Sequence, residues 1–263
     1  MRRLIDKLLG GRGRATATVT PHDERTAVDV SRSTDFGELR VFDTEYMGEE
    51  VRMLTVNGTQ ESAAYREPGR HGELVFQYTR SIAQILPGHD RALLIGGAGC
   101  SIAKYFVDSF PEGHIDVAEL HGEMIELARR YFFLGEFESE RMRIHVGDGA
   151  ELLGRRVSDG APGYDIIIND AYVGDVLDAG LQSERGMRLI HSALTPGGLY
   201  CLNIITAMEG YLSMGGLMQE QLAMRHFANV RLCQCNPRRD RTHRQNCLLL
   251  ASDGELPEVR GIY

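Results

Sequence analysis

The chain has 263 residues and a formal net charge of −8, with 43% hydrophobic and 25% charged residues. These values are typical of a globular protein with one large domain, or a core domain with a small appendage. The acidic balance argues against nucleic acid or an anionic membrane as the main partner. No apolar run approaches the ~20 residues of a membrane helix. The odd number of cysteines, five, favours reduced thiols and a cytoplasmic location, and no Cys and His spacing predicts a metal site.

The chain divides into three predicted regions. Residues 1–35 are rich in Arg, Thr, Ser and Asp without periodicity, which predicts a flexible N-terminal segment. Residues 36–70 contain two alternating stretches followed by the turn signal Asn57-Gly58, which predicts a small N-terminal β-hairpin domain. Residues 71–263 are expected to form a Rossmann-like cofactor-binding catalytic domain.

Helices and strands are predicted to alternate through the third region. A helix over 71–86 comes first, and 171–182 is expected to be a loop. The other predicted helices cover 100–109, 122–132, 149–154, 183–193 and 208–226, and the predicted strands cover 91–95, 114–118, 142–146, 164–169, 199–204, 229–235 and 246–251. This order predicts an α/β fold with a doubly wound mixed sheet, preceded by a small antiparallel sheet.

The stretch ALLIGGAGCSIA over residues 92–103 is the most informative one. A short apolar strand breaks into Gly96, Gly97 and Gly99 and then resumes as a helix. Glycines there allow the backbone to approach a ligand closely, and the following helix offers free N–H groups. This pattern predicts a nucleotide-binding turn, although a plain tight βα turn is the alternative.

Three acids follow, each at the end of a predicted strand. Glu119 comes about 20 residues after the glycines, where a nucleotide-binding unit places the acid that holds the ribose. Asp148 lies between two glycines, and Asp170 ends a buried strand. Each acid alone fits a solvated strand end or a helix N-cap. Because ligands of open α/β sheets bind outside the carboxyl ends of the strands, the three acids together predict one site.

The order of motifs resembles the polyamine aminopropyltransferase family, the spermidine synthases and their relatives, over residues ~37–252. The matching segments include NGTQES, LLIGGAG, HVGDGAELL, YDIIIND and TPGG. The resemblance implies the class I S-adenosylmethionine-binding fold. It also implies a sulfonium nucleoside as cofactor (S-adenosylmethionine or its decarboxylated form), no metal, a small-molecule acceptor that is an amine, and a homodimer.

The resemblance also implies roles for individual residues. Asp170 matches the catalytic aspartate, which accepts a proton from the attacking amine or orients it. The residues implied to bind the cofactor are Gly96, Gly97, Gly99, Glu119, Asp148 and Gly149. The residues implied to bind the substrate are Glu61, His71, Glu73, Tyr172 and Asp175. For His71 an ordinary place in the helix is the favoured alternative, and Tyr172 either stacks on substrate or anchors its loop.

Departures from the family pattern bear on specificity. Gly99 stands where the family has an aspartate that pairs with the amine of the decarboxylated cofactor, which favours the intact cofactor. His71-Gly72-Glu73 lacks the tyrosine of the family's gate helix. The second acid after Asp170 is missing, with Asp175 as the candidate replacement. These departures argue against a plain putrescine aminopropyltransferase.

The predicted function is therefore transfer of an alkyl group, aminopropyl or methyl, from a sulfonium nucleoside to an amine or another small acceptor. The alternatives are an S-adenosylmethionine-dependent methyltransferase and a non-catalytic nucleoside-binding relative. An NAD-dependent oxidoreductase is disfavoured because Ile102 stands where the dinucleotide motif needs a final Gly or Ala. The basic run 237–245 favours a solvated hairpin tip, with a site for an acidic acceptor as the alternative.

Overall fold

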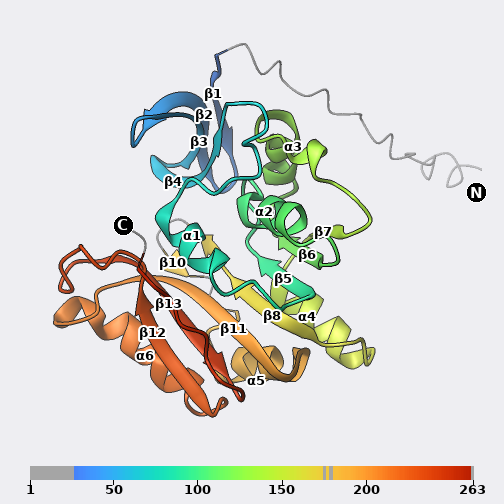
Figure 1. Cartoon of the computed structure of the whole chain (residues 1–263), viewed down its shortest axis with the longest axis vertical. Coiled ribbons are helices and arrows are strands. Elements are labelled where there is room, and N and C mark those ends of the chain that lie inside the picture. The colour runs from blue at the N-terminus through green and yellow to red at the C-terminus, as the bar shows by residue number, and fades with distance from the viewer. Residues whose placement is uncertain (1–26, 174–175, 178–179, 262–263) are drawn as a thin grey trace, which may run out of the picture.

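The computed structural model describes residues 27–173, 176–177 and 180–261. Within them the chain forms a small antiparallel sheet, a large mixed sheet and helices on both faces of the large sheet (Figure 1). The small sheet contains β1 (Asp29–Thr34), β2 (Gly37–Tyr46), β3 (Glu49–Val56) and β4 (Thr59–Tyr65) in sequence order. This arrangement confirms the predicted fold class.

The large sheet has the strand order β12-β13-β11-β8-β5-β6-β7. Its strands are β5 (Arg91–Ile95), β6 (His114–Glu119), β7 (Met142–Val146), β8 (Tyr164–Asn169), β11 (Leu194–Thr206), β12 (Asn229–Gln234) and β13 (Gln245–Ser252). Neighbouring strands from β7 to β11 pair in parallel, whereas β13 runs antiparallel to both β11 and β12. The carboxyl ends of the parallel strands therefore lie at one edge of the sheet.

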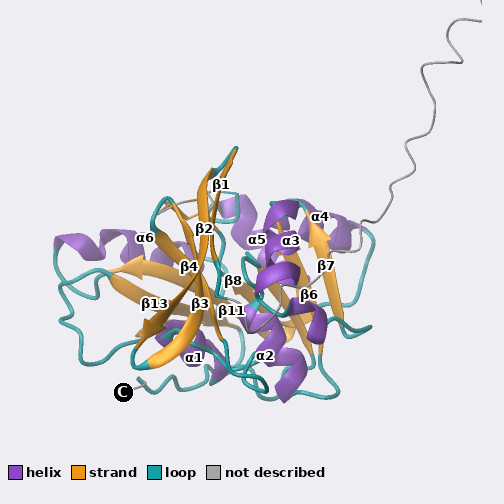
Figure 2. Cartoon of the chain, turned by 90° about the horizontal axis from the view of Figure 1, so that it is seen from above, coloured by secondary structure: helices purple, strands orange, loops and turns teal. Residues whose placement is uncertain are grey.

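Helices cover both faces of this sheet. They are α1 (Gln77–Ala83), α2 (Ser101–Ser109), α3 (Gly122–Tyr131), α4 (Gly149–Ser158), α5 (Glu184–Ala193) and α6 (Met214–Ala223), with short 3-10 turns η1 (Leu134–Glu136) and η2 (Tyr211–Ser213). Figure 2 shows α4, α5 and α6 on one side and α1 and α2 on the other. No helix among the described residues is both long and apolar enough to cross a bilayer.

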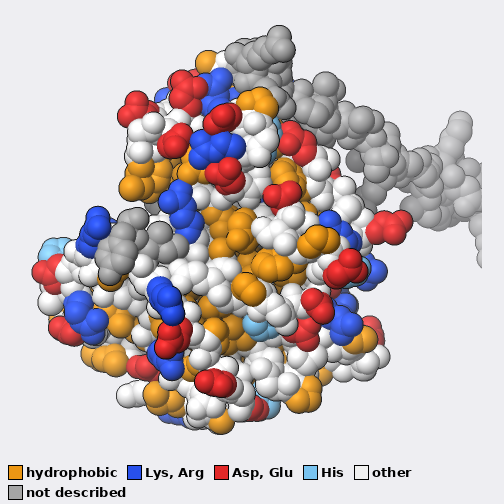
Figure 3. Space-filling view, in the orientation of Figure 1, with side chains coloured by type: hydrophobic (Ala, Val, Ile, Leu, Met, Phe, Trp, Pro, Cys, Tyr) orange, Lys and Arg blue, Asp and Glu red, His pale blue; other side chains and the backbone are white. Residues whose placement is uncertain are grey.

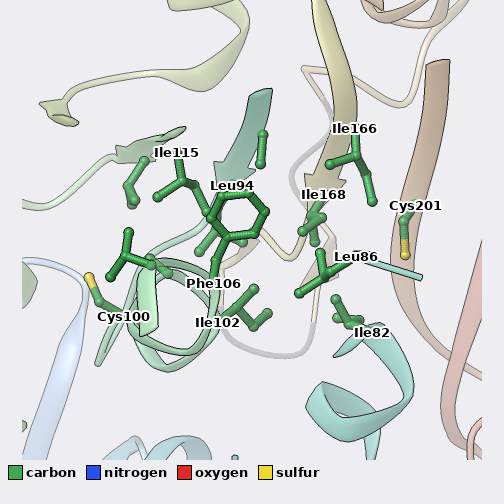
Figure 4. Packing of buried hydrophobic residues seen from close by; sticks show 14 of the residues in the cluster. Ile82, Leu86, Leu94, Cys100, Ile102, Phe106, Ile115, Ile166, Ile168 and Cys201 are labelled. Atoms are coloured by element: carbon green, nitrogen blue, oxygen red, sulfur yellow. The ribbon is translucent and has the colours of Figure 1, made fainter. Parts of the chain in front are cut away.

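Strand side chains alternate between two hydrophobic cores. Leu94 of β5 and Ile166 and Ile168 of β8 pack on the face covered by α1 and α2, and Phe106 of α2 lies against them (Figure 4). Ile167 and its neighbours on the opposite face pack against α4 and α5. Because side chains point alternately to opposite faces of a strand, a sheet buried on both sides gives the continuous apolar runs seen in the sequence.

The small sheet is joined to the large domain through a buried arginine. The Arg52 side chain is fully buried and donates to both carboxylate oxygens of Asp43, at 2.8 and 3.2 Å. It also donates to the main-chain oxygen of Tyr131, at the end of α3, at 3.2 Å. A buried ion pair with further hydrogen bonds is costly to break, so it fixes the small sheet against α3.

The structure corrects one predicted boundary. Residues 29–34, placed in the flexible segment, form β1, which pairs with β2 from Asp29 opposite Phe42 to Thr34 opposite Gly37. Its sequence, DVSRST, lacks alternation because both faces of this edge strand are largely exposed. Residues 1–26 lie outside the described residues.

Further elements differ from the predictions; α4 and β11 are longer than expected, and three others change more. The helix expected over 71–86 spans only Gln77–Ala83, because 71–76 form a non-helical turn whose Leu74 and Val75 are nonetheless buried. The helix expected over 208–226 begins at Met214, after Gly210 takes a positive φ of 77°. The predicted loop 171–182 contains a short ladder of β9 (Tyr172–Val173) and β10 (Val176–Leu177).

Candidate active site

A cavity of about 430 Å³ lies at the carboxyl edge of the large sheet. Its walls include the β1–β2 turn and β4 of the small sheet, the start of α1, the ends of the parallel strands, and residues of β13 and the β12–β13 loop. The outer surface over the small sheet carries closely mixed acidic and basic side chains, whereas hydrophobic side chains gather in the middle of the same face (Figure 3). The small sheet forms one wall of the cavity, and the carboxyl ends of the parallel strands form another.

The glycine turn after β5 forms part of the cavity wall. Gly96 has a φ of 90°, and a Cβ built there would overlap the main-chain oxygen of Asp170. A Cβ on Gly97 would lie 3.1 Å from Val117 and 3.3 Å from the Cβ of Glu119. Both glycines line the cavity, so at this turn the backbone itself, without side chains, forms the cavity wall.

Glu119, at the end of β6, is held by backbone N–H groups. One carboxylate oxygen, Oε2, accepts from Gly97 at 2.8 Å and from Ala98 at 3.0 Å, and Oε1 accepts from His121 at 2.9 Å. The side chain is buried and lines the cavity. Each carboxylate oxygen has two lone-pair directions, so this fixed carboxylate retains an acceptor site for a ligand hydroxyl.

Asp148, after β7, both caps a helix and lines the cavity. Its Oδ1 accepts from Ala150 at 2.6 Å and from Glu151 at 3.1 Å at the start of α4. Gly149 begins this helix and packs against Ile95 so closely that a Cβ would overlap it. The N-cap alternative from the sequence is therefore correct for Asp148, and its position in the cavity wall is compatible with a ligand role as well.

Asp170, just after β8, is held by side chains instead. Its Oδ1 accepts from the Asn203 amide at 2.7 Å, and its Oδ2 accepts from the Tyr78 hydroxyl at 3.1 Å. The carboxylate lines the cavity, and burial raises its pKa from 3.8 to about 6, although the two hydrogen bonds act in the opposite direction. At neutral pH it is a mostly ionised base, stronger than an ordinary aspartate.

A second layer of polar groups fixes this end of the cavity. The Asn246 amide of β13 donates to the Asn203 side-chain oxygen at 3.1 Å. The Tyr172 hydroxyl donates to the main-chain oxygen of Asn203 at 3.0 Å and accepts from the N–H of Ile205 at 2.9 Å. Tyr172 therefore anchors its loop to β11 while its ring lines the cavity.

Not every predicted site residue reaches the cavity. Glu61 on β4 does, but His71 and Glu73 are absent from its lining. The buried His71 stacks on Phe133, with ring centroids 3.6 Å apart, and its Nδ1 lies 2.8 Å from Glu136. Glu73 is exposed and pairs with Arg70 at 3.1 Å. The non-helical turn 71–76 directs both side chains elsewhere.

Two more of the predicted site residues are Gly99 and Asp175. Gly99 packs against the small sheet, because a Cβ there would overlap the Ser62 hydroxyl, and it does not line the cavity. The turn packs closely against β4 at Gly99, and an aspartate side chain at this position would overlap Ser62. Asp175 lies outside the described residues.

The sequence analysis missed the residues that hold Asp170. Tyr78 lies within the helix predicted over 71–86 and was given no role in the site, yet its hydroxyl reaches the Asp170 carboxylate. Asn203 and Asn246 are polar positions in otherwise apolar strands, a signal that could have identified them. Arg239, in the loop between β12 and β13, also lines the cavity.

These features define a class of protein: an α/β fold whose glycine turn and strand-end acids line one cavity next to a buried carboxylate. A family model, the spermine/spermidine synthase domain, matches residues 73–228. The chain belongs to this family.

Individual relatives agree with the family assignment. The polyamine aminopropyltransferase of Vibrio vulnificus is 27% identical over 154 residues, which are 57% of this chain and 50% of that protein. The human eEF1A lysine and N-terminal methyltransferase is 29% identical over 121 residues, 43% of this chain and 17% of that protein. The matched region is thus half or less of each relative's length.

Solved structures share the fold. The crystal structure of a probable spermidine synthase from Corynebacterium glutamicum gives a TM-score of 0.73 at 23% identity, covering 88% of this chain and 82% of that one. Human methyltransferase-like protein 13 in complex with SAH gives 0.52 at 22% identity, covering 69% and 78%. Both aminopropyltransferase-type and methyltransferase-type proteins therefore have this architecture.

Proposed function

We propose that this protein transfers an alkyl group from a sulfonium nucleoside to the nitrogen of a small amine. The observation that carries the proposal is the shared cavity of Glu119, Asp148 and Asp170, which combines a nucleoside-type site with a carboxylate base. The names of the relatives, an aminopropyltransferase and a lysine methyltransferase, support transfer to an amine.

The chain's own residues account for activation of the amine. An ammonium has no lone pair, so a proton must leave before the nitrogen can attack. Asp170, with a pKa of about 6, can accept that proton at neutral pH. Its two hydrogen-bond donors, Tyr78 and Asn203, hold the carboxylate in one orientation. Positioning the two reactants then supplies much of the rate enhancement.

The cavity fits a sulfonium nucleoside on structural grounds. Gly96 and Gly97 place backbone rather than side chains against it, and the Glu119 carboxylate is fixed for a ribose diol. When bound, S-adenosylmethionine or its decarboxylated form supplies an activated carbon and a neutral thioether leaving group. Neither a metal nor a covalent enzyme intermediate is needed for this transfer.

Two features bear on the choice of donor in opposite directions. The family aspartate that favours the decarboxylated donor is replaced by Gly99, which favours intact S-adenosylmethionine. Glu61, in contrast, adds a negative charge to the wall close enough to raise the pKa of Tyr78, together with burial and Asp170. A carboxylate at this place attracts the free amine of the decarboxylated donor and repels the carboxylate of the intact one.

The proposal is tested by calorimetric titration of both donors into the full-length protein and by Asp170→Asn. We expect one donor to bind, and the variant to retain its affinity within about 3-fold while transfer falls by about 1,000-fold, a typical loss for a missing general base. Binding of neither donor, or unchanged transfer by the variant, would overturn the proposal and favour a non-catalytic nucleoside-binding protein.

The donor preference has its own control. Glu61→Gln removes the charge but keeps the size of the side chain. If the wild type prefers the decarboxylated donor because of Glu61, this variant should bind the two donors with more similar affinities. Intact S-adenosylmethionine as the preferred donor in both proteins would assign methyl transfer.

A further inference from the structure

Arg239 is a cation on an otherwise acidic cavity wall. It lies in the loop between β12 and β13 and lines the same cavity as Glu61, Glu119, Asp148 and Asp170. Its guanidinium forms no ion pair with any of the described residues, although other charged groups of this loop do. Arg241 pairs with Glu209 and His243 pairs with Asp240.

The backbone of Arg239 is held in place. Its main-chain oxygen accepts from the Gln234 amide at 2.8 Å, and its N–H donates to the oxygen of Asn236 at 3.1 Å. Two residues later, the oxygen of Arg241 accepts from the N–H groups of Met208 and Glu209 at 2.8 and 3.1 Å. The loop is therefore fastened to the segment that follows β11, and Arg239 lines the cavity from a backbone that is held in place.

The sheet order places Arg239 on one side of Asp170. The nucleoside-type acids follow β6 and β7, whereas Asp170 follows β8, and Asn203 and Asn246 lie on β11 and β13. Neighbouring strands are about 5 Å apart, so β13 is about 10 Å from β8, away from the nucleoside side. Arg239 thus belongs to the part of the cavity beyond Asp170, where the acceptor must enter.

We infer that the acceptor is a zwitterionic amine: its nitrogen meets Asp170 and an anionic group at its other end meets Arg239. The inference rests on the proposed function and specifies its substrate class. A diamine, positively charged at both ends, would place its second ammonium beside the guanidinium, which is unfavourable. A chain with a carboxylate at that end matches both charges, since guanidinium and carboxylate form paired hydrogen bonds.

The transfer itself balances without another reactant. Asp170 takes one proton from the acceptor ammonium, which leaves a lone pair on nitrogen. That pair forms the new C–N bond while the C–S bond breaks and leaves its electron pair on sulfur. The sulfonium becomes a neutral thioether, the product is a charged secondary amine, and the acceptor's carboxylate keeps its contact with Arg239 throughout.

Matched acceptor pairs test the inference with the full-length protein and its preferred donor. The pairs are 4-aminobutanoate with 1,4-diaminobutane and 6-aminohexanoate with 1,6-diaminohexane; the members of each pair have the same number of carbons and differ in one end group, a carboxylate against an aminomethyl group. We expect at least one aminocarboxylate to be used with a kcat/KM about 10-fold or more above that of its diamine, the size of one charge-assisted contact. Equal use, preference for both diamines, or use of none of the four overturns the inference.

Variants assign the preference to a residue. Arg239→Gln should raise the KM of the aminocarboxylate about 10-fold, with kcat within about 2-fold, and should leave the diamine unaffected or improved. Arg238→Gln is the matched control, because Arg238 is the neighbouring exposed arginine of the same loop and does not line the cavity. An equal effect of the two variants would overturn the assignment.

The anionic group could instead belong to the donor, because intact S-adenosylmethionine carries a carboxylate. Titrating both donors into Arg239→Gln separates the two sources. Unchanged donor affinity supports the acceptor assignment, whereas a selective loss for intact S-adenosylmethionine assigns Arg239 to the donor and overturns it. Failure of both donors to bind the wild type is failure of the proposed function, a result distinct from all of these.

Discussion

The two halves of the cavity hold their acids in different ways. On the side where we propose that the nucleoside binds (the nucleoside side), Glu119 is fixed by three backbone N–H groups and Asp148 by two, all from residues at or next to the same turns. On the acceptor side, Asp170 is fixed by the side chains of Tyr78 and Asn203. One half is built from backbone geometry and the other from side-chain identity.

This difference has a physical consequence. Backbone N–H groups are present whatever the sequence, so the nucleoside half requires only glycines and correctly placed acids. The acceptor half depends on particular side chains from α1, β11, β13 and the β12–β13 loop. A family can therefore keep one donor site while it changes acceptors by substitution on the other side. The predictions below test whether the two halves are separable.

The largest expected effect on donor binding is on the nucleoside side. Glu119→Gln leaves one oxygen in place of two, so the side chain can no longer accept from both Gly97 and His121 and still bind a ribose hydroxyl. We expect donor affinity to fall about 100-fold, as for the loss of one or two hydrogen bonds to a charged group. The kcat at saturating donor should stay within about 3-fold, measured by steady-state kinetics.

Asp170→Asn is the matched variant from the other half, with the opposite pattern: donor affinity is kept and turnover is lost. If Glu119→Gln instead lowers kcat as strongly as it lowers affinity, the two halves are coupled through the glycine turn. Such coupling has a structural route, because the N–H of Asp170 donates to the main-chain oxygen of Ile95, immediately before Gly96, at 2.8 Å. The two halves of the cavity would then not be separable, and this hydrogen bond would connect them.

The next effect is on stability and depends on pH. The pKa of Asp170 is about 6 in the folded protein, against the ordinary value of 3.8 that applies in the unfolded chain. The folded state therefore binds the proton more tightly. Ionisation therefore destabilises the fold as pH rises through this window, and the full cost is present above about pH 6. Asp170→Asn removes that cost, so we expect it to be more stable than the wild type by about 2 kcal/mol at pH 8.

Urea unfolding at pH 8 and pH 4 measures this difference. Near pH 4 the Asp170 carboxyl group is protonated in the folded protein, so the gain should be close to zero. Glu119→Gln supplies the contrast, because it loses an acceptor for backbone N–H groups and should destabilise the protein at pH 8. If Asp170→Asn gains the same stability at both pH values, ionisation of the buried Asp170 carboxyl group does not destabilise the wild-type fold.

The sequence predicted one half of the cavity better than the other, for the reason given by this comparison. The glycine turn, Glu119 and Asp148 follow from local spacing along a βαβ pattern, and three strands of the large sheet (β5, β7 and β8) were predicted with the observed bounds. Tyr78 and Asp170 are 92 residues apart, and no local pattern links them. The link appears only when β8 and α1 meet in space.

The wrong predictions have related causes. His71 and Glu73 were assigned to a helix because buried side chains at helical spacing also occur in the non-helical turn 71–76. The assignment of Gly99 to the cofactor stays a prediction, but its missing Cβ accommodates Ser62, a packing contact that the sequence did not predict. β1 was missed because an exposed edge strand carries no alternation. In each case packing against a distant segment determined the outcome.

The smallest expected effect is a shift of the pH–rate profile by Tyr78→Phe. The Tyr78 hydroxyl donates to Asp170 and so stabilises its charged form, which lowers the pKa of this carboxyl. Without that donor the pKa should rise from about 6, and the acid limb of kcat against pH should move up by about 0.5–1 unit, with the plateau at high pH largely retained. Steady-state rates between pH 5 and 9 with one donor and one acceptor measure it.

Tyr172→Phe is the matched control for this shift. Its hydroxyl also lies at the acceptor end, but it bonds to the main chain at Asn203 and Ile205 and not to the Asp170 carboxylate. The control should lose some loop anchoring, seen as a higher acceptor KM, without moving the acid limb. Equal shifts in the two variants would mean that the acid limb reports general loosening of the loop. A shift confined to Tyr78→Phe would show that a side chain from α1 sets the basicity of Asp170.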